Sequence, residues 1–223
     1  MIRLLSIFLG FLLLLTGCSK TIPITADPKT VSVLIDPGHG GFDGGAVAED
    51  GTCEKHINLS ISLILRDLLK VCGVSVTMTR TTDQALNAED STATRSNKTS
   101  DMRARLALYQ QAETVLSIHQ NNFGISKYSG SQVFYSGNHS HSAVLAGALQ
   151  SAMRNMLQPD NHREIKKATD GIYLLHHTTV PCALVECGFL SNPEERNKLK
   201  DPSYQQQMAF AITVGYWDYI TMK

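Results

Sequence analysis

The spacing of apolar residues changes repeatedly along this chain, and each spacing predicts either a strand or a helix. Alternating apolar positions over 31–35 predict a buried strand that ends at Asp36. From Glu54 onward the apolar residues recur every three or four positions until Gly73, which predicts an amphipathic helix with a glycine stop. The same criteria predict strands over 74–79, 115–118, 132–135, 172–175 and 183–186, and helices over 102–112, 140–156, 193–199 and 202–219.

One long stretch, Thr81–Ser100, is rich in Thr, Ser, Asn and Asp and lacks either period, so it is predicted to be a surface loop. Elsewhere strands and helices alternate. This alternation favours an α/β fold, with a single domain built on a mainly parallel twisted sheet and helices on both of its faces. No internal repeat or second domain is evident.

The N-terminal residues have the pattern of an export signal. A basic residue, Arg3, precedes an apolar run over 4–15, which is shorter than the roughly 20 residues that a membrane span needs. The run leads to Leu-Thr-Gly-Cys, which resembles the lipobox of bacterial lipoproteins and would place a diacylglyceryl group on Cys18. We therefore expect a signal peptide over 1–17, a tether over 18–29, and a catalytic domain over 30–223. A plain N-terminal anchor and an ordinary cleaved signal remain alternatives.

Composition narrows the class of protein. The 223 residues include 20 Lys+Arg and 20 Asp+Glu, and 43% are hydrophobic, which fits one folded domain and excludes a disordered chain. Without a basic excess, nucleic acid is not an expected partner. The cysteines at 53, 72, 182 and 187 are expected to be mostly free thiols, the last three as small core residues. A zinc pair at 182 and 187 is a weaker alternative, because no second pair accompanies it.

Three segments that follow predicted strands carry most of the chemistry. They are DPGHGG (Asp36–Gly41), SIHQN (Ser117–Asn121) and VECGFLSN (Val185–Asn192). In open α/β sheets, ligand sites gather at the carboxyl ends of the strands, so the three segments are expected to meet. Glu54, at the start of the first helix, adds another carboxylate.

Among these residues are the parts of a zinc hydrolase. His39, Glu54 and His119 can supply three ligands and leave one position for water. Glu186 is then the candidate to take a proton from water and pass it to a leaving nitrogen. Asp36 is expected to orient a ligand histidine.

Spacing alone leaves other interpretations open, because no short metal motif such as HExxH is present. His39 could be a loop residue, His119 a core histidine, Glu54 a helix-start carboxylate, and Glu186 the partner of an arginine. The glycine-rich GHGGFDGG segment lacks the spacing and the Lys-Ser/Thr pair of a phosphate-binding loop.

The motifs taken together resemble a known family. IDPGHGGFDGGA, the glutamate of GTCEKHINL, TRTTD, SIHQNNF and PCALVECGFLSNPEE are similar, in order and spacing, to the zinc-dependent N-acetylmuramoyl-L-alanine amidases of the amidase-3 type. The resemblance implies one zinc ion bound by His39, Glu54 and His119, with Glu186 catalytic. It also implies hydrolysis of the amide between the lactyl group of N-acetylmuramic acid and L-alanine in peptidoglycan.

Longer segments, RSNKTSDMRAR, GSQVFY, NHREIKKA and YLL, look like the germination-specific amidases of spore-forming bacteria. That subgroup implies a role in spore cortex maturation, where peptide-free muramic acid becomes muramic-δ-lactam. Arg80, Arg105, Arg163 and Asn121 are candidate contacts for the acidic stem peptide. The expected partners are peptidoglycan and, through Cys18, the outer face of the cytoplasmic membrane; no protein partner is indicated. A non-catalytic wall-binding lipoprotein and a zinc peptidase acting within the stem remain alternatives.

Overall fold

The computed structural model describes residues 32–86 and 93–222, so the predicted signal peptide, the tether and Cys18 lie outside the described residues. A six-stranded sheet forms the centre of the molecule, in the order β2-β1-β3-β6-β4-β5. All neighbouring strands run parallel except β4 and β6, which are antiparallel. The strands are β1 (Ser32–Pro37), β2 (Ser75–Met78), β3 (Val115–Asn121), β4 (Gln132–Tyr135), β5 (Lys166–Lys167) and β6 (Cys182–Phe189).

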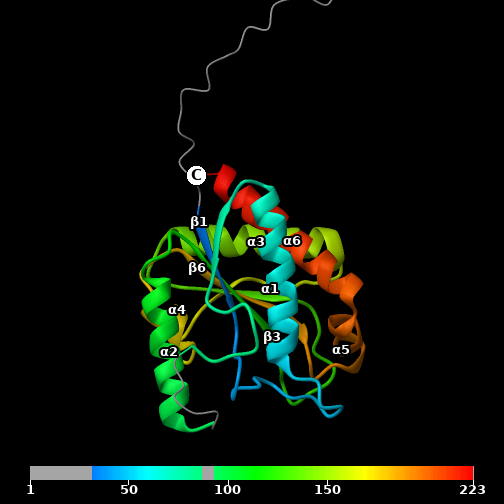
Figure 1. The fold of residues 1–223 in the computed structure, drawn as a ribbon. Coiled ribbons are helices and arrows are strands. Elements are labelled where there is room, and N and C mark those ends of the chain that lie inside the picture. Colours follow the sequence, from blue (N-terminus) through cyan, green and yellow to red (C-terminus); the bar gives the residue numbers. More distant parts are fainter. Residues whose placement is uncertain (1–31, 87–92, 223) are drawn as a thin grey trace, which may run out of the picture.

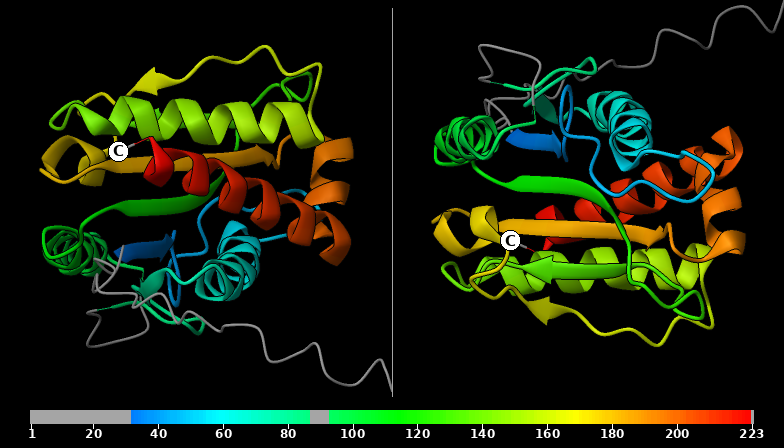
Figure 2. Two further views of the ribbon diagram at one scale, coloured as in Figure 1. Left: turned by 90° about the horizontal axis from the view of Figure 1, so that it is seen from above. Right: turned by 90° about the horizontal axis from the view of Figure 1, so that it is seen from below.

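Within the described residues, six helices lie around this sheet (Figure 1). They are α1 (Glu54–Val71), α2 (Arg95–Tyr109), α3 (His141–Leu157), α4 (Tyr173–His177), α5 (Pro193–Lys200) and α6 (Pro202–Thr221). The long helices α1, α3 and α6 pack together against one face of the sheet, while α2 and α4 contact each other on the other face (Figure 2). The predicted α/β fold, with a mainly parallel sheet between helices, is confirmed.

Two apolar cores explain why the central strands are apolar along their whole length. Val33 and Ile35 of β1 face α1, α3 and α6, whereas Leu34 between them packs with Tyr109 and Leu184 on the opposite side. A strand covered on both faces buries successive residues, so the period of two is lost within it. The smaller core under α2 and α4 leaves the adjoining part of that face open, and the chemistry lies there.

Two predicted elements were wrong. The segment 172–175 is not a strand: Leu174 and Leu175 belong to the short helix α4 and are buried there. A short apolar run fits either element, since it is too brief for its period to show. Helix α2 begins at Arg95 rather than at Met102, because the Thr94 hydroxyl caps it by accepting from the Asn97 N–H at 3.1 Å. Its first turns are mostly exposed, so no apolar period marks them.

The cysteines at 53, 72, 182 and 187 are free thiols in the structure. Cys182 and Cys187 are buried, as expected of small core residues, but Cys72 is exposed and that part of the prediction was wrong. Within residues 32–86 and 93–222, no helix combines the length and apolar character that crossing a bilayer requires.

Candidate metal centre and active site

The predicted site residues meet at the carboxyl ends of the central strands. His39 lies in the loop after β1, Glu54 begins α1, and His119 lies near the end of β3. Glu186 of β6 pairs in register with His119 on the neighbouring parallel strand. Paired residues of adjacent strands project from the same face of a sheet, so the two side chains share one side.

His39, Glu54 and His119 place a donor atom each within 4.8 Å of one another. Between them, His39 Nε2 lies 3.2 Å from Glu54 Oε2 and His119 Nδ1 lies 2.9 Å from Glu54 Oε1. The backbone N–H groups of Ala46 and Gln120 also donate to the Glu54 carboxylate, at 2.9 and 3.0 Å, and fix its position. Two imidazoles and one carboxylate are the donor set of a catalytic zinc ion, and these three fit it.

Two glycines leave room for this cluster. A Cβ atom on Gly38 would lie 2.2 Å from His119 Cε1, and one on Gly45 would lie 2.6 Å from Glu54 Oε2. His39 itself adopts a left-handed backbone conformation, with φ 63°. A non-glycine residue in this region is uncommon and is held there by its surroundings. The glycine-rich loop therefore serves to bring the imidazoles close to Glu54.

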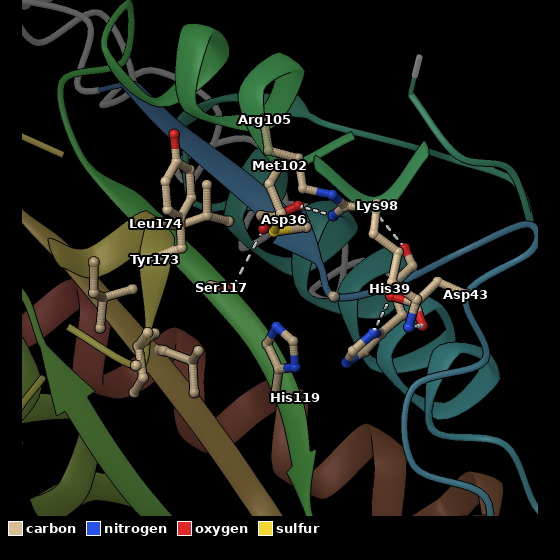
Figure 3. A pocket seen from close by; sticks show the side chains of 15 residues that line it. Asp36, His39, Asp43, Lys98, Met102, Arg105, Ser117, His119, Tyr173 and Leu174 are labelled. Carbon is tan, nitrogen blue, oxygen red and sulfur yellow. Dashed lines mark hydrogen bonds and ion pairs between the residues drawn. The ribbon is translucent and has the colours of Figure 1, made fainter. Parts of the chain in front are cut away.

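The carboxylate that orients a ligand histidine is Asp43. Its Oδ2 lies 2.8 Å from His39 Nδ1, and Lys98 binds the other oxygen at 3.1 Å (Figure 3). This leaves His39 Nε2 directed toward Glu54. Burial lowers the pKa of His39, but the adjacent carboxylates of Asp43 and Glu54 outweigh it and raise the pKa to about 9. A negative environment that favours a positive charge at this point also favours a divalent cation.

Asp36 occupies a different place from the one predicted. Its buried carboxylate accepts hydrogen bonds from Thr79, Tyr109, Ser117 and Arg105, and no histidine of the described chain is among its hydrogen-bond partners. Burial raises the pKa of Asp36, but Arg105 and the hydroxyl donors hold it below its ordinary value. Arg105 links Asp36 to the glycine-rich loop, because it also donates to the His39 carbonyl.

Arg80 and Arg105 were predicted to contact the substrate. This prediction was wrong, because both guanidinium groups are buried and bonded within the protein. Arg80 donates to the carbonyl oxygens of Pro37, Gly38, Lys55 and Thr82. Arg105 pairs with Asp36 and Asp101 and donates to the carbonyl oxygens of Pro37 and His39, the latter at 2.6 Å. They support the glycine-rich loop.

Glu186 supplies a buried carboxyl group beside the cluster. Its Oε2 atom is buried and has no hydrogen-bond partner in the described part of the chain. Burial raises its pKa to about 8, with a further contribution from the nearby charge of Glu54. A carboxyl with an unused oxygen and a raised pKa can both accept and release a proton near neutral pH.

Two hollows flank this centre. A cavity of about 280 Å³ lies toward α2 and α4, where Met102, Tyr173 and Leu174 join the two histidines in its lining (Figure 3). A second, of about 370 Å³, lies toward the β4 and β5 edge and includes Asn121 and Arg163, both predicted as substrate contacts. Arg105 also lines the first cavity, but its guanidinium group is buried and paired with Asp36 and Asp101.

Sequence reasoning missed several residues of the site. Asp43 had a usable signal, because it follows His39 by four residues in a loop that must turn back on itself. Lys98 lay within the stretch predicted to be a loop. The local sequence around Gln132 and Lys166 does not mark them as site residues. They lie near the site because β4 pairs with β6 and β5 pairs with β4.

Residues 33–216 match the family model described as N-acetylmuramoyl-L-alanine amidase. The chain belongs to this family. The match covers every element from β1 to most of α6 and includes all residues of the metal cluster together with Glu186. The predicted enzyme class, a peptidoglycan amidase, is confirmed.

Two of the relatives of this amidase are named for germination or sporulation. The germination-specific N-acetylmuramoyl-L-alanine amidase of Bacillus subtilis is 36% identical, over all of this chain and 96% of the relative. The sporulation-specific amidase of the same species is 31% identical, over 80% of this chain and 64% of the relative. The CwlD amidase of Clostridioides difficile, solved in complex with the GerS lipoprotein, has a TM-score of 0.83 at 37% identity, covering 87% of this chain and all of that chain.

Proposed function

We propose that this amidase is zinc-dependent and hydrolyses the amide between the lactyl group of N-acetylmuramic acid and L-alanine. One observation carries the proposal: His39, Glu54 and His119 converge within 4.8 Å, and the buried carboxyl of Glu186 stands beside them. The family supplies the class of substrate. The donor set indicates which metal would bind, because two imidazoles and a carboxylate are typical of catalytic zinc.

The chain's own groups divide the work. When bound, zinc would polarise the scissile carbonyl and lower the pKa of a water molecule. Glu186 removes a proton from the attacking water and transfers it to the nitrogen of L-alanine, which then leaves as an amine. Asp43 holds the His39 ring so that Nε2 faces the centre, and the N–H groups of Ala46 and Gln120 hold Glu54.

The alternatives differ in their products. A non-catalytic wall-binding protein would release nothing, and a peptidase acting within the stem would release fragments that lack L-alanine. Purified protein is expected to release whole stem peptides with a free L-alanine amino group and to leave the glycan strands intact. Mass spectrometry of the digested peptidoglycan measures both products, and fragments without L-alanine would contradict the proposal.

For the biological setting, we propose cortex peptidoglycan of the developing spore as the substrate. Two relatives, one named germination-specific and one named sporulation-specific, support this setting. Removal of the stem peptide would leave muramic acid free for conversion to muramic-δ-lactam. Spores that lack this chain should then contain no muramic-δ-lactam, and a normal content would contradict the role.

We also propose that Cys18 carries lipid and holds the enzyme on the outer face of the cytoplasmic membrane. The chain enters the sheet at Ser32, and β1 then runs for six residues, or about 20 Å, before the metal-binding loop. A tether ahead of Ser32 would thus place the active site at the far end of the domain. Incorporation of a labelled fatty acid that persists in Cys18→Ala would contradict the anchor.

A protein partner is a further proposal. The relative solved with the GerS lipoprotein supports a lipoprotein partner for this chain as well. Cross-linking of the full-length chain in membranes, followed by identification of the attached protein, tests it; cross-links to no lipoprotein would contradict it.

A further inference from the structure

The cavity of about 370 Å³ beside the active site is built around Arg163. The Arg163 guanidinium lies over the Phe189 ring, 4.5 Å from its centroid, and 5.9 Å from the centroid of Tyr128. Phe123 packs edge-on against Tyr128 at 5.3 Å and extends this aromatic wall. The stacking restricts the guanidinium to one plane beside the cavity.

Two hydrogen bonds fix the same group. Arg163 Nε donates to the Ser129 carbonyl at 2.7 Å, and one of its terminal nitrogens donates to Gln132 Oε1 at 3.2 Å. Both acceptors are neutral, so neither cancels the positive charge. The remaining N–H groups stay available to a ligand in the cavity.

No carboxylate in the described part of the chain forms an ion pair with Arg163. Glu195 is near enough for Arg163 to be among the charges that lower its pKa against the effect of burial. However, the two Glu195 oxygens accept from the backbone N–H groups of Gly130 and Phe189, each at 2.8 Å. Lys166, exposed on β5, adds a second positive charge to the lining of this cavity. A preorganised cation with no anion of its own is suited to bind one.

The register of the strands shows where the cavity around Arg163 lies relative to the amide bond that is cleaved. On one side of Glu186 is His119, a metal ligand, and on the other side is Gln132 of β4. Because Glu186 delivers a proton to the leaving nitrogen, the departing peptide extends from Glu186 away from the metal, toward β4 and β5. Gln132 is the residue that Arg163 bonds, so Arg163 lies about one amino acid beyond the cleaved amide.

We propose that Arg163 and Lys166 bind a free carboxylate of the acidic second residue of the stem peptide. Asn121, which lines the same cavity, is placed to contribute its side-chain amide. The glycan then occupies the opposite side, toward the cavity between α2 and α4. This inference rests on the proposed function and adds a preference for stem peptides whose second residue is not amidated.

The test compares two synthetic N-acetylmuramoyl-L-alanyl peptides that differ only in the free or amidated α-carboxyl group of the second residue. The zinc-loaded enzyme is expected to show a kcat/KM about 10–100-fold higher for the free carboxylate, as a charge-assisted hydrogen bond would give. Arg163→Gln should make the two kcat/KM values equal, and Arg163→Lys should restore part of the preference. Lys166→Gln should lower the ratio by a smaller factor. A ratio measured within one variant is independent of how much of that variant is folded.

Arg103→Gln is the matched control, because Arg103 is exposed on α2 away from this cavity, and it should leave the ratio unchanged. If Arg163→Gln slows both substrates equally, Arg163 has only a structural role and the subsite is overturned. A wild-type enzyme that hydrolyses both substrates at equal rates also overturns the subsite but leaves the amidase function intact. If the enzyme hydrolyses neither substrate, the proposed function itself is overturned.

Discussion

Replacing Glu186 with glutamine is expected to lower kcat by about 10²–10⁴-fold, the range typical of a lost general acid–base. Glutamine preserves the size of the side chain but cannot take a proton from water or transfer one to the leaving nitrogen. Because Glu186 Oε2 has no hydrogen-bond partner among the described residues, the substitution breaks no contact of that atom. Zinc content and thermal stability are therefore expected to stay close to those of the wild type.

Two measurements separate this role from a structural one. Zinc per chain in Glu186→Gln should equal that of the wild type, so that the loss lies in the chemical step. Glu194→Gln, at an exposed position in the first turn of α5, should retain full kcat and controls for a change of charge. Activity above a tenth of the wild-type value in Glu186→Gln would remove Glu186 from the mechanism.

Replacing Arg105 with leucine is expected to reduce the free energy of unfolding by about 3–5 kcal/mol, because it removes the positive charge that compensates buried carboxylates. Arg105 is fully buried and pairs with Asp36 and Asp101, so its loss removes the counter-charge of two carboxylates at once. It also ties α2 to the loop after β1 through the His39 carbonyl, and zinc affinity should fall as well. Urea denaturation of Arg105→Leu and of the exposed control Arg103→Leu measures the difference, with the control expected within about 0.5 kcal/mol of wild type.

The pH dependence of this difference follows from Asp36. Its pKa is lower in the folded state than its ordinary value of 3.8, so it stabilises the fold fully above that value and loses this effect as the pH falls through the folded-state pKa. The deficit of Arg105→Leu is therefore expected to be full at neutral pH and to shrink below about pH 4. A deficit that is constant down to pH 3 would show that the Asp36–Arg105 pair is not its source.

The clustering of the three candidate metal ligands could be predicted because each stands at the end of an apolar strand or at the start of a periodic helix. For His39, Glu54 and His119, the position in the fold follows from the local pattern, and the topology of a parallel sheet then brings them together. The family resemblance added the assignment of roles, which spacing alone had left open.

The supporting residues could not be predicted in the same way, because a buried arginine and a substrate-binding arginine have the same sequence signal. Arg80 and Arg105 are distinguished from Arg163 only in the structure, where the first two are buried and bonded within the protein and Arg163 is half-buried beside a cavity. Asp36 was misplaced for a related reason. It lies near the end of β1, but its side chain pairs with Arg105 rather than with a histidine.

Titrating zinc into chelator-stripped full-length enzyme tests most directly whether His39, Glu54 and His119 hold a zinc ion on which hydrolysis depends. Release of L-alanine-terminated stem peptides should be absent from the stripped protein and should return in proportion to added zinc, reaching a plateau at one equivalent per chain. His119→Ala should show no such recovery at that stoichiometry. Full release by the metal-free wild type would show that hydrolysis does not depend on zinc. A plateau that His119→Ala also reaches at one equivalent would show that His119 does not hold the ion.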